Sequence, residues 1–195
     1  MSHPDAEKWN GRYRTDGPNW LQNKPRRLLQ TRLPHLPCCG LALDAASGVG
    51  VNGLALARHG LHVVALDISQ EGLRLARQLF AQEGLAVDTA VYDLAHPWFP
   101  PNSFDVIINF RFLERATFSA YRRALKPGGW LIFETFVKTD RETEYPAHFL
   151  EPGELHRAFA DFVVHFSGQE EVVRNGRNYK TTDQFVAQKP ITIPV

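Results

Sequence analysis

The sequence predicts an α/β fold, with a doubly wound, mostly parallel sheet of seven strands, an antiparallel hairpin at one edge and a helical segment in front. Three observations support this prediction. From residue 40 onward, short apolar runs alternate with segments of helical length and periodicity, a pattern typical of βαβ units. Polar side chains follow successive apolar runs. The last two runs are joined by turn residues with little helical signal, which indicates an antiparallel pair.

The first 39 residues are expected to form a helical lid segment, separate from residues 40–195. Trp9, Tyr13 and Trp20 are spaced for a lid or a packing face. Pro25 opens a second helical stretch, and Pro34 stands near its end. The spacing therefore predicts two helical pieces that precede the sheet.

The remaining elements follow in order along the chain. Gly60 and Gly84 each stop a helix, and Ser69 can cap the second helix at its start. A turn at 175–176 joins the last two strands. The predicted strands are 40–43, 61–66, 85–91, 104–109, 130–136, 162–166 and 182–187, and the predicted helices are 51–59, 70–83, a segment around 118–125 and a short one from 152.

Composition and charge limit the classes of function. The chain of 195 residues carries 22 basic and 21 acidic side chains, so it lacks the basic surplus of a protein that depends on nucleic-acid phosphates. Lys24, Arg26, Arg27 and Arg32 cluster, and we interpret them as a solvated helix face rather than a phosphate site. No apolar stretch is long enough to span a bilayer, and the polar N-terminus has no signal-peptide core. The two cysteines are adjacent and are expected to be free thiols, so we expect a cytoplasmic protein without a membrane partner.

Four polar residues stand where predicted strands end: Asp44, Asp67, Asp93 and Asn109. Ligands of open α/β sheets bind outside the carboxyl ends of the strands, near the point where the strand order reverses. The sequence therefore predicts one crevice that gathers these side chains.

The glycine-rich loop distinguishes two kinds of nucleotide. GVGVNG, at 48–53, matches the dinucleotide pattern, but Asp44 and three further residues precede Gly48. A carboxylate there would repel a pyrophosphate, whereas it suits a ligand with a sulfonium or ammonium group. S-adenosylmethionine is such a ligand. Asp44 could instead cap the following turn.

Two further carboxylates fit an adenosine. Asp67 lies 17 residues after Gly50, where it can accept hydrogen bonds from both ribose hydroxyls. NAD carries the same ribose, so Asp67 alone does not discriminate. Asp93 is placed to accept a hydrogen bond from the exocyclic amine of adenine, although it could also cap a loop.

With these residues in view, the chain resembles the class I S-adenosylmethionine-dependent methyltransferases. The resemblance runs from about residue 40 to 188 through LDAASGVG, VVALDIS, YDL, SFDVIINFRFLER and LKPGGWLIFETF, in the family's order and spacing. The Trp-rich N-terminus and HFLEPGELHRAF resemble the small bacterial branch grouped with tellurite and thiopurine methyltransferases. The resemblance implies a Rossmann-like methyltransferase domain at 40–195, with S-adenosylmethionine as the cofactor.

Carried over by position, the resemblance implies three groups of cofactor contacts. The loop from Asp44 to Gly50 would surround the methionine moiety. One position departs from the family, because Ala46 stands where its first loop glycine does, and alanine is strained at positive φ. The implied cofactor-binding residues are Asp44, Ala45, Ala46, Ser47, Gly48 and Gly50 in the loop, Asp67, Ile68, Asp93 and Leu94 around the adenosine, and Asn109, Phe110 and Arg111 below the sulfonium.

Methyl transfer needs positioning and exclusion of water more than a dedicated catalytic group, so no catalytic residue is named and no metal site is expected. Arg111 could bind an anionic substrate or form a surface ion pair with Glu114. Substrate contacts are predicted for Tyr13, Arg14, Arg111, Glu114 and Glu134.

The sequence thus predicts an S-adenosylmethionine-dependent methyltransferase that acts on a small molecule. An RNA or protein methyltransferase of the same fold is one alternative, which the near-zero net charge disfavours for RNA. An NAD-dependent oxidoreductase is a second. A cofactor-binding module without catalysis is a third, and the alanine in the loop keeps it open.

Overall fold

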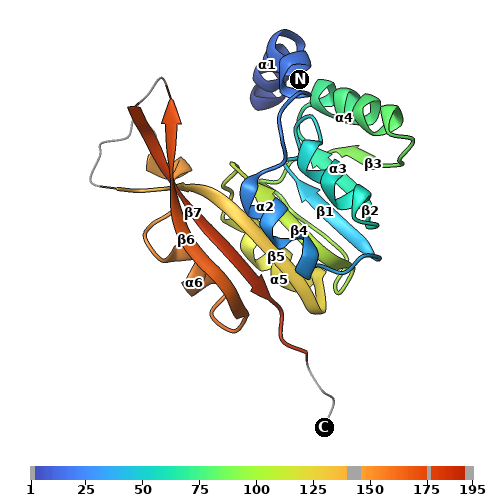
Figure 1. Ribbon diagram of the computed structural model, residues 1–195. Coiled ribbons are helices and arrows are strands. Elements are labelled where there is room, and N and C mark those ends of the chain that lie inside the picture. Colours follow the sequence, from blue (N-terminus) through green and yellow to red (C-terminus); the bar gives the residue numbers. More distant parts are fainter. Residues whose placement is uncertain (1–2, 140–145, 175–176, 192–195) are drawn as a thin grey trace.

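A computed structural model describes residues 3–139, 146–174 and 177–191. Its centre is a seven-stranded sheet with the order β3-β2-β1-β4-β5-β7-β6 (Figure 1). The five strands from β3 to β5 run parallel, whereas β7 is antiparallel to both β5 and β6. This topology confirms the predicted fold class. The strands are β1 (Leu41–Ala45), β2 (His62–Asp67), β3 (Asp88–Val91), β4 (Phe104–Phe110), β5 (Leu125–Val137), β6 (Val163–Arg174) and β7 (Arg177–Gln188).

Helices cover both faces of the sheet, and each face has its own apolar core. Along β4 the side chains alternate, so that Val106 and Ile108 join one core while Ile107 joins the other. Helices α2, α3 and α4 contribute to the first core, and α5 and α6 to the second. The helices are α1 (Pro4–Trp20), α2 (Arg27–Arg32), α3 (Val51–Arg58), α4 (Gln70–Gln82), α5 (Ala116–Ala124) and α6 (Glu154–Ala158), with 3₁₀ turns at Leu33–His35 and Pro146–His148.

Two predicted boundaries near α4 and α5 are wrong for local reasons. Strand β3 begins at Asp88 and not at Leu85, because the Leu85 N–H donates to the Phe80 carbonyl (3.0 Å) and so closes the C-terminus of α4. Leu125 starts β5 instead of ending α5, since the proline two residues later does not allow the helix to continue.

The hairpin of β6 and β7 is longer than predicted, with 12 residues in each strand. Strand β7 lies between β5 and β6, with Phe133 opposite Phe185 and Phe136 opposite Thr182. The predicted turn at 175–176 lies outside the described residues. Among the helices that the structure describes, none combines the length and apolarity needed to cross a bilayer. Both cysteines are free and exposed.

Candidate active site

A large cavity of about 1460 Å³ opens at the carboxyl ends of the parallel strands, with α1 on one side and β7 on the other. It brings together most of the residues that the sequence singled out. On its wall lie Tyr13, Ala46, Ser47, Gly48, Asp67, Ile68, Asp93, Leu94, Phe110, Arg111 and Glu114. Off the wall, within the described chain, lie Asp44, Ala45, Gly50, Asn109, Arg14 and Glu134.

The loop from β1 to α3 forms the floor of this cavity. The Ser47 N–H donates to the Leu66 carbonyl (2.9 Å), which ties the loop to β2. Gly48 has a φ of 57°, and a Cβ there would come within 2.7 Å of the Tyr13 hydroxyl, so only glycine fits. The buried Ser47 hydroxyl has no hydrogen-bond partner among the described residues, which leaves a polar atom available to a ligand at the cavity floor.

The strain expected at Ala46 is present, because this residue has a φ of 55°. The left-handed region costs an alanine roughly 1–2 kcal/mol relative to glycine, which has no Cβ. The loop therefore keeps Ala46 in the left-handed conformation despite this cost in free energy.

Replacing Ala46 with glycine should therefore raise the free energy of unfolding by about 0.5–1 kcal/mol, since the relief of strain outweighs the added freedom of the unfolded chain. Urea denaturation measures the change. The matched control is Ala76→Gly in the interior of α4, where the same change should destabilise. Equal losses in both variants would contradict a strained loop.

Asp67 is a buried carboxylate in the cavity wall. Its Oδ2 accepts a hydrogen bond from Gly48 N (2.8 Å) and its Oδ1 one from Ser69 N (2.8 Å). Burial raises the pKa of Asp67 although these hydrogen bonds oppose the shift. Each carboxylate oxygen has a second lone pair, so Asp67 can still accept hydrogen bonds from ligand hydroxyls.

Asp44 lies beneath the loop, off the cavity wall. Its Oδ2 accepts a hydrogen bond from Gly53 N (2.8 Å), so it forms the cap that was the alternative interpretation of its position. Burial, with a smaller contribution from Asp67, raises the pKa of Asp44 to about 7 despite that hydrogen bond. A Cβ on Gly53 would approach Asp44 Oδ2 to 2.8 Å, which explains the third glycine of the motif.

Asp93 and Asn109 hold loops at two other strand ends. Asp93 Oδ1 accepts from Ala95 N (2.8 Å), while its side chain stays partly exposed in the cavity. Asn109 is buried, donating to the Phe112 carbonyl (2.8 Å) and accepting from the Tyr121 hydroxyl (3.1 Å). Asn109 therefore fixes the loop after β4 and does not face the cavity.

Arg111 pairs with Glu134 and not with Glu114, which corrects the expected ion pair. Arg111 Nε lies 3.1 Å from Glu134 Oε1, in the arrangement of an ion pair rather than of a directed hydrogen bond. Glu134 is 1% exposed, and its other oxygen accepts from Gln184 Nε2 (3.0 Å). Burial lowers the pKa of Arg111 and the Glu134 charge opposes that shift. Glu114 instead accepts from Ala116 N (3.1 Å) at the start of α5.

Helix α1 packs beside the cavity, against the start of α4. Asn10 Oδ1 accepts from the Ser69 hydroxyl (2.7 Å) and from Glu71 N (3.1 Å), which joins α1 to the N-terminus of α4. The Tyr13 ring stacks near Trp9 (5.8 Å between centroids) and meets Trp20 edge-on (5.2 Å). Arg14 is on the exposed face of α1.

The far wall of the cavity contains residues that the sequence did not single out as ligands. Phe136 at the end of β5, Phe149 after the 3₁₀ turn and Lys180 on β7 all line it. Sequence patterns class Phe136 as a core residue, and nothing in the motifs marks Lys180. Only the pairing of β7 with β5 brings them together.

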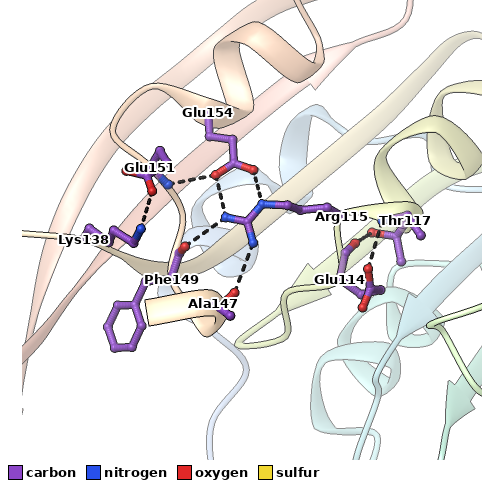
Figure 2. Close-up of polar contacts among 9 residues, drawn as sticks. Glu114, Arg115, Thr117, Lys138, Ala147, Phe149, Glu151 and Glu154 are labelled. Carbon is purple, nitrogen blue, oxygen red and sulfur yellow. Dashed lines mark hydrogen bonds and ion pairs between the residues drawn. The ribbon is translucent and has the colours of Figure 1, made fainter. Parts of the chain in front are cut away.

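Phe149 is held in place by a network around Arg115 (Figure 2). The Arg115 guanidinium donates twice to Glu154, at 2.6 and 2.9 Å, and also to the carbonyl oxygens of Ala147 and Phe149, both at 3.1 Å. Such paired contacts between two charged planar groups are geometrically specific. The hydrogen bond to Glu154 raises the pKa of Arg115, and burial opposes that shift.

These features fit a ligand that is cationic and carries an adenosine. Two buried carboxylates lie under and beside the glycine loop, with an unpartnered hydroxyl at its floor. Within the described residues, no group of three or more His, Cys, Asp or Glu side chains could hold a metal ion.

Comparison with known proteins agrees with this description. Residues 42–129 match the profile of a family described as a methyltransferase domain. No curated protein matches the chain in sequence.

Solved structures resemble the chain in fold. TehB from Haemophilus influenzae has a TM-score of 0.73 at 20% identity, covering 83% of this chain and 61% of that one. A protein from Methanosarcina mazei, described as an S-adenosylmethionine-dependent methyltransferase, has a TM-score of 0.67 at 20% identity, with coverages of 87% and 100%. Geranyl diphosphate C-methyltransferase from Streptomyces coelicolor, solved with Mg²⁺, geranyl diphosphate and S-adenosyl-L-homocysteine, has a TM-score of 0.71 at 14% identity, with coverages of 94% and 96%.

At these identities the structural matches establish the fold, and the family profile adds the methyltransferase domain. The chain therefore carries a methyltransferase domain over residues 42–129 and has the Rossmann-like fold of S-adenosylmethionine-dependent methyltransferases.

Proposed function

We propose that the protein transfers the methyl group of S-adenosylmethionine to a small molecule bound in the outer part of the same cavity. The observation that carries this proposal is the size and shape of the cavity, about 1460 Å³ from the Asp67 loop to Lys180. Pockets for a single ligand measure about 300–1,000 Å³, so this one offers room for the cofactor and an acceptor together.

The cofactor would be held at the inner end. Gly48 and Ser47 would face its methionine part, and Asp67 would accept hydrogen bonds from its ribose. Asp93 and Leu94 would meet the adenine. When bound, the cofactor supplies a methyl carbon activated by a positively charged sulfur, and the protein's part is to align the acceptor and exclude water.

Residues 1–39 are proposed to act as the cover of this site. The contacts of Asn10 hold α1 against α4, and Tyr13 reaches the glycine loop from above. A helix at this place narrows access for a folded protein or a structured RNA more than for a small molecule.

The alternatives receive less support. Asp44 and Asp67 are buried near the loop that would receive the pyrophosphate of NAD, and they disfavour an anion there. The net charge of +1 gives no general attraction for RNA. The fold neighbour from Streptomyces coelicolor is described with geranyl diphosphate, which supports a small-molecule acceptor only by similarity of fold.

The Asp67→Asn variant tests the cofactor site. It keeps one oxygen, which can accept from either Gly48 N or Ser69 N, but it loses the charge and the other acceptor, so affinity for S-adenosylmethionine should fall about 10- to 100-fold. Alanine would be a poorer choice, because both Gly48 and Ser69 N–H groups would lose their partner. Calorimetric titration with S-adenosylmethionine, S-adenosylhomocysteine and NAD measures the change.

Asp88→Asn is the matched control, because this exposed aspartate lies at the start of β3, away from the cavity. It should bind both S-adenosyl compounds as the parent protein does, and no variant should bind NAD. Unchanged affinity in Asp67→Asn would reject the ribose contact, and binding of NAD alone would reject the proposed cofactor.

A further inference from the structure

The far wall of the cavity places two cations against one aromatic ring. The Arg111 guanidinium lies 4.8 Å from the centroid of Phe136, and Lys180 Nζ lies 4.6 Å from it. Lys180 is also 4.9 Å from the ring of Phe149, and the two phenylalanine rings are 5.8 Å apart. The result is an apolar surface with an ammonium group at its centre.

The charges on this wall are not equally balanced. Glu134 neutralises Arg111, and Glu151 forms an ion pair with Lys138 at the cavity mouth. Glu170 accepts a hydrogen bond from Gln184. Among the described residues, no carboxylate forms an ion pair with Lys180, so its charge is balanced only by aromatic faces.

A further cation adds to the positive electrostatic potential at this wall. Arg26, which lines the cavity from the segment before α2, contributes to lowering the pKa of Arg111. Like charges held near each other favour the binding of an anion. The wall therefore carries a surplus of positive charge beside apolar rings.

Hydrogen bonds and strand pairing hold the groups of this wall in position. The Arg115 contacts hold the backbone that carries Phe149 (Figure 2). Phe136 on β5 pairs with Thr182 on β7, and Lys180 on β7 pairs with Val172 on β6. Tyr179, which is 49% exposed, extends the aromatic surface at the rim. A ligand would meet groups that are already in place, which lowers the entropy cost of binding.

We propose that the methyl acceptor is an apolar, aromatic small molecule that carries one carboxylate, with the carboxylate paired to Lys180 and the apolar body against Phe136 and Phe149. This inference rests on the proposed function, whose acceptor it defines more closely.

The chemistry favours a carboxylate over other charges. An ammonium on the ligand would be repelled by Lys180 and Arg26. A phosphate is best held by an arginine fork, but the guanidinium of Arg111 is engaged by Glu134. Lys180, which has no carboxylate partner among the described residues, matches a single negative charge on the ligand. This negative charge is also compatible with a positively charged cofactor in the same cavity.

The test uses the full chain saturated with S-adenosylhomocysteine. Benzoate and phenylacetate are the probes, each compared by ligand-observed NMR with its neutral amide and with benzylamine. We expect the acids to bind with dissociation constants of about 1 mM or tighter, and at least about 10-fold more tightly than the amides or the amine.

Lys180→Met removes the charge but keeps an apolar stem, so it should abolish the preference for acids. Lys180→Arg should restore most of it. Lys126→Met removes the same charge at a lysine that does not line the cavity and pairs with Asp105, and it should leave the preference intact. Thermal unfolding and binding of S-adenosylhomocysteine verify that each variant is folded.

The outcomes separate the two proposals. Equal binding of acids and amides, no binding of the acids, or an unchanged preference in Lys180→Met would overturn the carboxylate inference, while cofactor binding would leave the proposed function standing. Failure of the parent protein to bind either S-adenosyl compound would overturn both.

Discussion

The Asp44→Asn variant should be more stable than the parent protein, by about 2–3 kcal/mol near pH 8. Burial raises the pKa of Asp44 to about 7, against an ordinary value of 3.8. Above that pH the folded protein holds a buried charge at a cost of about 4 kcal/mol, because each pH unit between the two pKa values corresponds to about 1.4 kcal/mol. The asparagine oxygen can still accept from Gly53 N. Its buried NH2 group has no acceptor, which offsets the gain in stability by about 1 kcal/mol.

The pH dependence gives the sharper test. Because the folded-state pKa is raised, folding takes up a proton on Asp44 between about pH 4 and pH 7, and the stability of the parent falls as pH rises through this window. The advantage of the variant should grow across the same window and stay constant above about pH 7. Urea denaturation at several pH values measures it.

Asp88→Asn serves as the control, because it makes the same substitution at a side chain that is 70% exposed. A gain in Asp44→Asn that did not vary with pH would contradict a buried titrating carboxylate. A loss of stability at all pH values would show that the charge itself supports the fold, through the N-terminus of α3.

Removing Arg111 should be strongly destabilising. Arg111→Met leaves Glu134, which is 1% exposed, with its charge unbalanced, and the free energy of unfolding should fall by about 3–5 kcal/mol. The Glu134→Gln variant alone should lose less free energy of unfolding, since the guanidinium of Arg111, which lies near the cavity, can then be solvated by water. Urea denaturation of both single variants and of the double variant measures the coupling.

In the double variant the second change should recover most of the loss, because neither charge then remains unpaired. The two losses should therefore be clearly non-additive. Additive losses would mean that the two side chains do not stabilise each other, despite their separation of 3.1 Å.

The parallel part of the sheet was predictable because its signals are local. The apolar period, the glycine stops and the Ser69 cap, whose hydroxyl accepts from Gly72 N (3.1 Å), all lie within one element. The start of β3 was not predictable in this way, because a hydrogen bond to Phe80 decides it. The positive φ of Ala46 was predictable, since the resemblance to a glycine position indicated it.

The composition of the cavity depends on contacts between distant strands. Glu134 reaches Arg111 because Phe110 on β4 stands opposite Glu134 on β5, a register that no local pattern reveals. Lys180 reaches Phe136 because Phe136 stands opposite Thr182. Motifs in the sequence could therefore indicate the proposed cofactor end of the cavity, whereas the proposed acceptor end requires the pairing of β7.

The place of β7 in the sheet has a consequence for biosynthesis. Residues 130–134 of β5 pair on one side with β4, whereas on the other side residues 130–137 pair with residues 181–188 of β7. A ribosome therefore completes β5 and β6 while the outer edge of β5, with Trp130, Leu131 and Phe133, still lacks its partner. An apolar edge of this kind can pair with another chain. The last strand to emerge thus closes the sheet, and a chain that ends before it leaves an edge open to aggregation.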